Sequence, residues 1–167
     1  YIHAARRNID LTVLLYNNYI YGMTGGQVSP TTPKGNRAST APYGNLEPAF
    51  NISGLAQAAG ASFVARGDVY HVKKLDKLIK TALQRRGFSL VEILSPCPTA
   101  YGRRNKMGHP VTLMKWLKEN TVSVEKWEKL SDEEREGKVR TGIIHDVERP
   151  EFTAEYQKLI ERFKADE

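Results

Sequence analysis

The stretch Ile9-Asp-Leu-Thr-Val-Leu-Leu-Tyr-Asn-Asn-Tyr-Ile-Tyr-Gly-Met-Thr-Gly-Gly-Gln27 decides the fold. It opens with a β-branched, apolar run of strand length (9–16), continues with two asparagines and ends in a glycine-rich segment. Apolar residues fill most of the run instead of alternating, which is typical of a strand covered on both faces in a parallel sheet. The runs 62–66 and 88–94 resemble it, so the sequence predicts several such strands.

Helical patterns separate and follow these strands. They are found at 52–59, 71–86, 111–119 and 153–165. The pattern at 71–86 repeats its apolar residues at spacings of three and four, which indicates one buried helical stripe. The helix at 153–165 is expected to begin at Thr153 as its cap and to pack through a similar stripe. Strands alternating with helices predict the α/β class, with a mainly parallel sheet flanked by helices.

Composition excludes several classes of protein. Of 167 residues, 40% are hydrophobic and 26% charged, which excludes a wholly disordered chain, a collagen and a disulfide scaffold. No apolar run approaches the roughly 18 residues of a membrane span, and no secretion leader is evident. The single cysteine, Cys97, fits a reducing compartment, and the cytoplasm is the default expectation. The opening Tyr1–Arg7 resembles the end of a helix, so we expect the C-terminal part of a longer polypeptide.

Charge divides the chain into two parts. Residues 1–120 hold 16 basic against 6 acidic residues (+10), and residues 121–167 hold 9 against 13 (−4). We therefore expect a basic body at 1–120 and an acidic C-terminal extension at 121–167, with an edge strand near 140–145. A basic body favours an anionic ligand or an acidic partner. Nucleic acid, a phosphate-bearing cofactor and an acidic redox protein all meet that description.

The segment after the first strand carries the first candidate site. Ligands of parallel α/β sheets bind at the carboxyl ends of strands. An asparagine oxygen, a backbone carbonyl two residues later and two phosphate oxygens would make much of an Mg²⁺ octahedron. Glycines permit close approach of the backbone, and Thr24 with free amide groups could hold phosphate. The alternative is an ordinary glycine-rich turn, because isolated glycine motifs have low specificity.

The segment after the strand at 88–94 carries the second candidate. Cys97 lies between two prolines, and the cations Arg103 and Arg104 follow it. Positive charge lowers the pKa of a thiol and favours its use as a metal ligand. The two arginines could also pair with a substrate carboxylate. An inert buried cysteine and a solvated basic loop remain the alternatives.

These strings together resemble a known family. The asparagine pair with Tyr21-Gly-Met-Thr-Gly-Gly-Gln27 and Ser29-Pro-Thr-Thr-Pro33, and the segment Ser95-Pro-Cys-Pro-Thr-Ala-Tyr-Gly-Arg-Arg-Asn105, resemble the β subunits of 2-oxoacid:ferredoxin oxidoreductases. The resemblance covers about residues 1–120 and is nearest to the 2-oxoglutarate-type enzymes. It implies the C-terminal portion of a thiamine-diphosphate-binding fold, incomplete at its N-terminus.

The resemblance implies roles for individual residues. Asn18 would be the side-chain ligand of Mg²⁺, and Ile20 would contribute its backbone carbonyl. Thr24, Gly25 and Gly26 would lie along the diphosphate, with Met23 close to the thiazolium ring. The family's metal motif opens with Gly-Asp-Gly, which this sequence lacks, so we expect the isolated chain to bind the cofactor poorly and to be inactive.

Cys97 would be the last of four ligands to a 4Fe–4S cluster, with the other three outside the chain. The implied reaction is oxidative decarboxylation of 2-oxoglutarate to succinyl-CoA with reduction of ferredoxin. The implied partners are an α subunit, ferredoxin, the 2-oxoacid and coenzyme A, in a hetero-oligomer without a membrane. The cofactor-activating glutamate would come from the α subunit, so no catalytic residue is assigned in this chain.

Two alternatives remain open. Pyruvate or another 2-oxoacid could be the substrate instead of 2-oxoglutarate. A basic nucleic-acid-binding module would also explain the +10 charge of residues 1–120. Against that second alternative, the sequence has no recognised DNA- or RNA-binding motif, and the acidic extension would repel phosphate.

Overall fold

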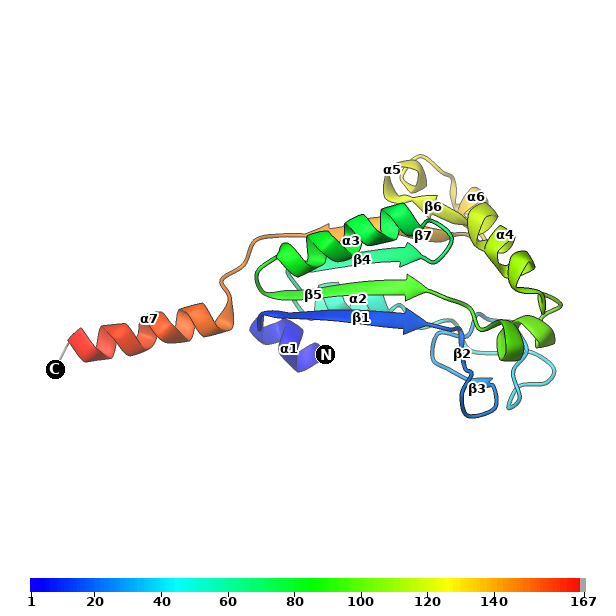
Figure 1. Cartoon of the computed structure of the whole chain (residues 1–167), viewed down its shortest axis with the longest axis horizontal. Helices are drawn as coiled ribbons and strands as arrows, with labels where there is room; N and C mark the ends of the chain where they lie inside the picture. The colour runs from blue at the N-terminus through cyan, green and yellow to red at the C-terminus, as the bar shows by residue number, and fades with distance from the viewer. Residues whose placement is uncertain (166–167) are drawn as a thin grey trace.

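A five-stranded sheet forms the centre of the computed structural model, which describes residues 1–165 (Figure 1). Its strand order is β1-β5-β4-β7-β6. The bounds are β1 Leu11–Asn17, β4 Phe63–Asp68, β5 Phe88–Leu94, β6 Thr121–Ser123 and β7 Val139–Asp146. β1, β5 and β4 run parallel, whereas β7 runs antiparallel to β4. The predicted class, α/β with a mainly parallel sheet, is confirmed.

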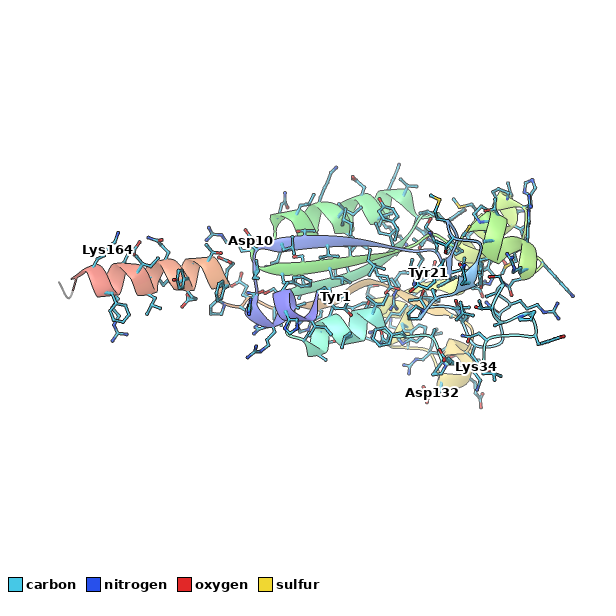
Figure 2. The ribbon with its side chains drawn as sticks, turned by 90° about the horizontal axis from the view of Figure 1, so that it is seen from below. Tyr1, Asp10, Tyr21, Lys34, Asp132 and Lys164 are labelled. Atoms are coloured by element: carbon cyan, nitrogen blue, oxygen red, sulfur yellow. The ribbon has the colours of Figure 1, made fainter. Side chains whose placement is uncertain are left out.

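Helices cover both faces of the sheet. Seven α-helices and one π-helix are present within residues 1–165: α1 Ile2–Arg7, α2 Ile52–Ala58, α3 Val72–Gln84, η1 Pro98–Gly102, α4 Pro110–Asn120, α5 Val124–Trp127, α6 Asp132–Arg135 and α7 Phe152–Ala165. Figure 2 shows α1 and α2 on one side of the sheet and α3 on the other. Each side has its own apolar core, one around Phe88 and Leu90 and the other around Phe63 and Val91. The predicted helices at 52–59, 71–86 and 111–119 are confirmed within two residues at each end.

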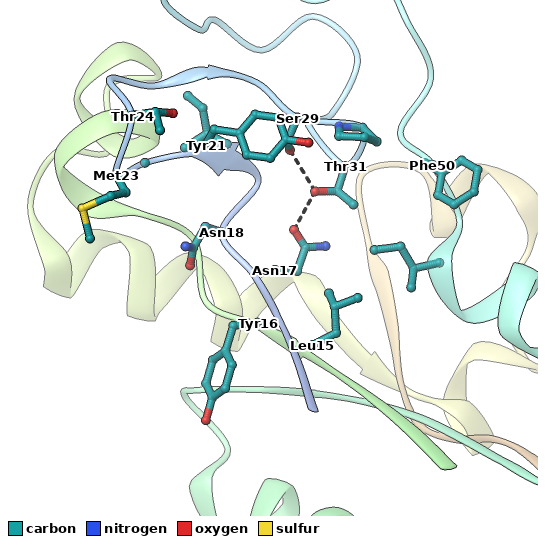
Figure 3. A pocket seen from close by; sticks show the side chains of 14 residues that line it. Leu15, Tyr16, Asn17, Asn18, Tyr21, Met23, Thr24, Ser29, Thr31 and Phe50 are labelled. Carbon is teal, nitrogen blue, oxygen red and sulfur yellow. Dashed lines mark hydrogen bonds between the residues drawn. The ribbon is translucent and has the colours of Figure 1, made fainter. Parts of the chain in front are cut away.

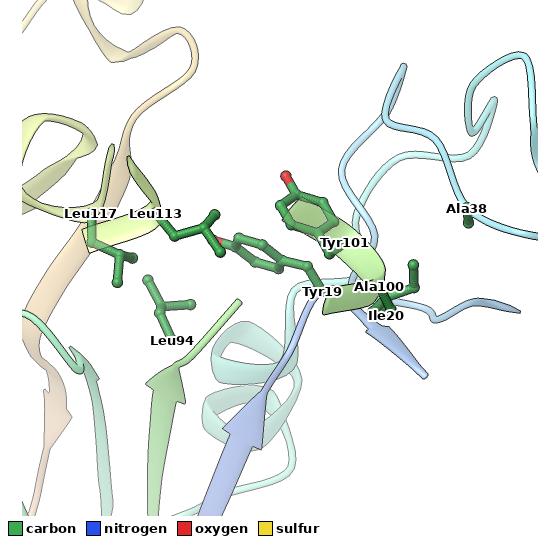
Figure 4. Close-up of a cluster of buried hydrophobic side chains, with 8 residues drawn as sticks. All are labelled: Tyr19, Ile20, Ala38, Leu94, Ala100, Tyr101, Leu113 and Leu117. Carbon is green, nitrogen blue, oxygen red and sulfur yellow. The ribbon is translucent and has the colours of Figure 1, made fainter. Parts of the chain in front are cut away.

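A third apolar cluster closes the carboxyl ends of the parallel strands. Its buried members come from the segments after β1 and β5 and from α4: Tyr19, Ile20, Ala38, Leu94, Ala100, Tyr101, Leu113 and Leu117 (Figure 4). A short hairpin of β2 (Ile20–Tyr21) and β3 (Gln27–Val28) continues from this cluster. The segments that carry the two candidate sites therefore both pack into this cluster at the carboxyl edge of the sheet.

The prediction that the first strand is covered on both faces is wrong for residues 1–165. β1 ends the strand order and pairs only with β5. Leu14 is 39% exposed and Tyr16 is 65% exposed. The apolar composition of β1 was correctly identified, but the sequence does not reveal its position at the sheet edge.

The predicted edge strand at 140–145 is a strand, but it does not lie at the edge. β7 pairs with β4 on one side and with the three-residue β6 on the other. β6 was not predicted, because three residues carry too little periodicity to be recognised. The division at residue 120 stays a prediction, and residues 166–167 lie outside the described residues.

The terminal helix differs most from expectation. α7 extends away from the sheet (Figure 1). The carboxylate of Glu151, not Thr153, caps the helix by accepting the backbone N–H of Thr153 and of Ala154, at 2.8 Å each. The apolar stripe of α7 is exposed, since Tyr156 is 56% and Phe163 65% accessible. No helix within residues 1–165 is both long and apolar enough to cross a membrane.

Candidate cofactor site

The two predicted site segments lie against each other. β1 and β5 are neighbours, and their last residues, Asn17 and Leu94, are partners in the parallel register. The N–H of Cys97 donates to the carbonyl oxygen of Asn18 at 3.2 Å. A Cβ placed on Gly22 would lie 3.0 Å from the Sγ of Cys97. The thiol therefore rests on the glycine-rich segment, a contact that no local pattern could reveal.

A cavity of about 710 Å³ opens beside this contact (Figure 3). Asn18, Ile20, Met23 and Thr24, all predicted cofactor contacts, lie in its wall. The rest of its lining comes from the end of β1, β2 and the turn after it, the loop after β3 and the start of α2: Leu15, Tyr16, Asn17, Tyr21, Gly22, Ser29, Pro30, Thr31, Phe50 and Ile52. The Met23 side chain is fully exposed, so the cavity is open along that side.

Tyr19, between the two predicted metal ligands, has a strained backbone. Its φ is 61°, in the left-handed region, which costs a residue with a Cβ about 1–2 kcal/mol. Its N–H donates to the Asn17 Oδ1 at 3.0 Å, and its carbonyl accepts the Thr32 hydroxyl at 2.6 Å. Its ring packs on Tyr101, with 5.4 Å between centroids. This strained turn is held from three sides, as is typical of functional loops.

The two asparagines have different environments. Asn17 is buried, and its Oδ1 also accepts the Thr31 hydroxyl at 2.7 Å (Figure 3). Its Nδ2 donates to the Oε1 of Glu92 at 2.8 Å. Asn18 is exposed in the cavity wall, where its amide is available to a ligand. The sequence analysis missed Glu92, although a carboxylate in the mostly apolar run 88–94 was a visible signal.

The glycine turn that follows is held by a cation. Gly25 and Gly26 have φ values of 115° and 86°, which favour glycine. The Arg104 Nη2 lies 3.5 Å from the Gly25 carbonyl oxygen, while its Nη1 donates to the Ala100 carbonyl at 3.1 Å. A Cβ on Gly26 would come within 2.9 Å of the same Nη1. Neither glycine lines the cavity. They follow Thr24, which does, and they form the turn that contacts Arg104.

Arg103 is in a different position. Like Arg104 it is exposed, but it contacts a different segment: a Cβ on Gly108 would lie 3.2 Å from the Arg103 Cγ. Its neighbour Arg104 is the one that contacts the glycine turn. The two cations that the sequence treated as a pair thus occupy separate environments.

The surroundings of Cys97 favour the thiolate. Burial, the largest single influence, acts to raise the pKa of this thiol. Hydrogen bonds from the Thr99 hydroxyl and from the N–H groups of Ala100, Thr99 and Tyr101 outweigh it and lower the pKa below its ordinary value. The Sγ lies 3.4 Å from the Thr99 Oγ1. Cys97 precedes η1, so the backbone N–H groups at the start of that helix face it.

The donors present fit part of a magnesium and diphosphate site. An exposed amide oxygen, a carbonyl on a strained turn and a glycine turn beside a guanidinium are groups that bind hard cations and phosphates. Within residues 1–165, no group of three or more His, Cys, Asp or Glu side chains could hold a metal ion. The sequence also holds only one cysteine. The described residues thus offer oxygen donors at the cavity wall and one thiol, Cys97, beside it.

Comparisons with known proteins identify the family of the chain. The family described as thiamine pyrophosphate enzyme, C-terminal TPP binding domain, matches residues 1–93. The chain is 49% identical over 166 residues to 2-oxoglutarate synthase subunit KorB of Methanocaldococcus jannaschii, covering 99% of this chain and 62% of that protein. It is 51% identical over 160 residues to the protein of the same name from Methanothermobacter marburgensis, covering 96% of this chain and 56% of that protein. The chain thus spans about 60% of the length of these relatives.

A solved structure is similar as well. It is a 2-oxoglutarate:ferredoxin oxidoreductase from Magnetococcus marinus with 2-oxoglutarate, coenzyme A and succinyl-CoA bound. It matches with a TM-score of 0.80 and 29% identity, over 98% of this chain and 56% of that one. The resemblance inferred from the short sequence strings is thereby confirmed.

Proposed function

Because the chain belongs to the thiamine pyrophosphate enzymes, whose C-terminal TPP binding domain matches residues 1–93, we propose that it is the cofactor-binding part of a 2-oxoglutarate:ferredoxin oxidoreductase β subunit. The complete enzyme would convert 2-oxoglutarate and coenzyme A to succinyl-CoA and CO₂ and reduce ferredoxin. One observation carries the proposal. The Asn18–Thr24 cavity wall and the Cys97 thiol meet at Gly22, so a thiamine site and a cluster ligand would be neighbours.

The cofactor would lie along the cavity wall. The amide oxygen of Asn18 and the carbonyl of Ile20 would bind Mg²⁺, and Thr24, Gly25 and Gly26 would hold the diphosphate. Met23 would lie beside the thiazolium ring. When bound, thiamine diphosphate supplies the carbanion chemistry that decarboxylates a 2-oxoacid. The remaining metal ligands would come from polypeptide outside this sequence.

Cys97 would provide one thiolate of a 4Fe–4S cluster, which supplies one-electron chemistry. Its lowered pKa supports this role, since the thiolate is the form that binds metal. The position of the thiol against Gly22 would keep the cluster close to the cofactor. For the 2-oxoacid carboxylates we propose Arg103 and Arg104 as partners, with Arg104 also close to the diphosphate turn.

The chain would act within a larger assembly. An α subunit, ferredoxin and coenzyme A are the proposed partners, and the cytoplasm is the proposed location. Within the chain, residues 1–120 would form the cofactor-binding part and residues 121–167 an acidic extension. The exposed apolar side chains Leu14 and Tyr16 on β1 and Met23 at the cavity support coverage by further polypeptide.

The substrate is tested on the complete α/β complex. Rates of ferredoxin reduction are measured with 2-oxoglutarate, pyruvate and 2-oxoisovalerate, each with coenzyme A. We expect 2-oxoglutarate to give the highest kcat/KM. A preference for pyruvate would contradict the proposed substrate but not the family. Absence of coenzyme-A-dependent oxidation of all three would contradict the proposed reaction.

The metal site is tested with Asn18→Ala in the same complex. Loss of one oxygen ligand should raise the Mg²⁺ concentration needed for half-maximal thiamine diphosphate binding by roughly tenfold or more. Tyr21→Phe, which changes an exposed hydroxyl in the same cavity wall, is the matched control and should leave that concentration unchanged. An unchanged Mg²⁺ requirement in Asn18→Ala would show that the metal ligands are elsewhere.

A further inference from the structure

A buried carboxylate, Glu92, lies behind the asparagine pair. It is 3% exposed on β5, a strand buried along its whole length. Its Oε1 accepts the Asn17 Nδ2 at 2.8 Å, and its Oε2 accepts the Ser53 hydroxyl at 2.9 Å and the Arg66 Nε at 2.8 Å. Burying a carboxylate is costly unless it is paired, so donors from β1, α2 and β4 compensate for it. Arg66 and Ser53 thus have a structural role as hydrogen-bond partners of Glu92.

The Asn17 amide connects Glu92 to the loop after β1 by hydrogen bonds at both of its ends. An amide has one donor end and one acceptor end, whereas a carboxylate only accepts. Because Glu92 takes the Nδ2, the Oδ1 must face the loop, where it accepts the Tyr19 N–H and the Thr31 hydroxyl. Tyr19 is the residue with the left-handed backbone, directly between Asn18 and Ile20.

We propose that Glu92 is a positioning residue for the Mg²⁺-binding loop. By fixing the orientation of the Asn17 amide, it holds the strained Tyr19 turn and thereby sets the Asn18 side chain and the Ile20 carbonyl. Glu92 itself contacts neither ligand group. This inference rests on the proposed function, which identifies Asn18 and Ile20 as the groups that bind the metal.

Replacement of the carboxylate by an amide creates a specific conflict. In Glu92→Gln, the cation Arg66 favours the side-chain oxygen at the former Oε2 position, so the new Nε2 faces Asn17. Asn17 must then turn its oxygen toward Gln and its Nδ2 toward the Tyr19 N–H, which places two donors together. The loop loses the hydrogen bond that holds its left-handed residue.

Exchanging the two functional groups removes the conflict. Asn17→Asp alone places two carboxylates at the 2.8 Å contact and is expected to damage the loop as well. In the double variant Asn17→Asp with Glu92→Gln, the Gln amide donates to the Asp carboxylate. The other Asp oxygen can still accept from Tyr19 and Thr31. If each substitution acted only by disturbing the packing, their effects on cofactor binding would add in the double variant. If they act through a conflict of hydrogen-bond donors and acceptors, the double variant should bind the cofactor better than either single variant.

The experiment uses the complete α/β complex and needs no turnover. Equilibrium dialysis with thiamine diphosphate at graded Mg²⁺ gives the Mg²⁺ concentration for half-maximal cofactor binding. We expect each single variant to raise it by roughly tenfold, and the double variant to return to within about threefold of the wild type. The control is Ser89→Ala on the same strand, a buried hydroxyl without a hydrogen-bond partner in residues 1–165, which should leave the value unchanged.

Each outcome separates this role from the proposed function. A wild-type complex that binds no Mg²⁺–thiamine diphosphate contradicts the proposed function itself. A wild-type complex that binds it, with an unchanged requirement in Glu92→Gln, contradicts only the role of Glu92. If Glu92→Gln fails to fold, the double variant decides: near-normal binding supports the proposal. A double variant that binds no better than Asn17→Asp, or that also fails to fold, overturns it.

Discussion

Cys97 shows at the scale of one residue how backbone geometry sets chemistry. Its position before η1 brings three backbone N–H groups and the Thr99 hydroxyl to a single sulfur. These hydrogen bonds stabilise the thiolate more than burial destabilises it, so the pKa of the thiol is lowered. Flanking cations, on which the sequence argument relied, are not among the causes of the shift. The predicted direction is correct, but the physical cause is different.

A pH profile tests this cause at the residue scale. In cluster-free protein, Thr99→Ala removes one hydrogen bond to the thiolate and should raise the pKa of Cys97. The rate of alkylation by iodoacetamide should therefore reach half its maximum at a higher pH than in the wild type. Thr112→Ala, on an exposed turn of α4, is the matched control. An unshifted pH profile in Thr99→Ala would show that the Thr99 hydroxyl does not lower the pKa of Cys97.

At the scale of elements, Asn8 joins parts of the chain that are distant in sequence. It ends α1 in the left-handed conformation, with φ 55°, and is 2% exposed. Its Oδ1 accepts the Phe88 N–H at 2.9 Å and the Ser62 hydroxyl at 2.7 Å. Its Nδ2 donates to the Pro150 carbonyl at 2.9 Å. One amide thus connects α1, the starts of β4 and β5, and the segment before α7.

Substitutions at Asn8 should lower the free energy of unfolding. Asn8→Ala leaves the Phe88 N–H and the Ser62 hydroxyl unpaired in the interior, which should cost about 2 kcal/mol or more. Asn8→Gly loses the same hydrogen bonds but tolerates the left-handed backbone, so it should cost about 1 kcal/mol less than the alanine variant. Denaturant unfolding measures both. Wild-type stability in Asn8→Ala would contradict the connecting role.

At the scale of the whole molecule, α7 is the outlying element. Its backbone is tied to the body where the Phe152 N–H donates to the Asn8 carbonyl at 3.2 Å. Its aromatic and aliphatic stripe, from Phe152 to Phe163, remains exposed. The sheet and its two helical layers therefore owe little of their stability to this helix.

Deletion of residues 152–167 should hardly change the thermal stability of the chain without partners. Loss of exposed contacts alters stability by at most about 0.5 kcal/mol, which corresponds to a shift in Tm of roughly 2 °C for a chain of this size. Thermal melting followed by circular dichroism measures the shift. A decrease above about 5 °C would show that α7 packs against the body in solution.

The sequence by itself determined the local features of this protein. Strands and helices leave local patterns in the sequence: apolar runs, helical spacings of apolar residues, and glycines or prolines at the ends of elements. The strands at 62–66 and 88–94 and the helices at 52–59 and 71–86 could therefore be predicted. The asparagine pair and Cys97 were recognised for the same reason, since each belongs to a short string with a characteristic chemistry.

Only the tertiary structure decided how these parts meet. The edge position of β1, the interior position of β7, the contact between Gly22 and Cys97 and the hydrogen bond between Asn17 and Glu92 join residues far apart in the sequence. Periodicity shows which apolar side chains share a face, not which strand, helix or carboxylate lies against that face. That choice is made when the whole sheet packs, because pairing energies depend on all neighbouring elements at once.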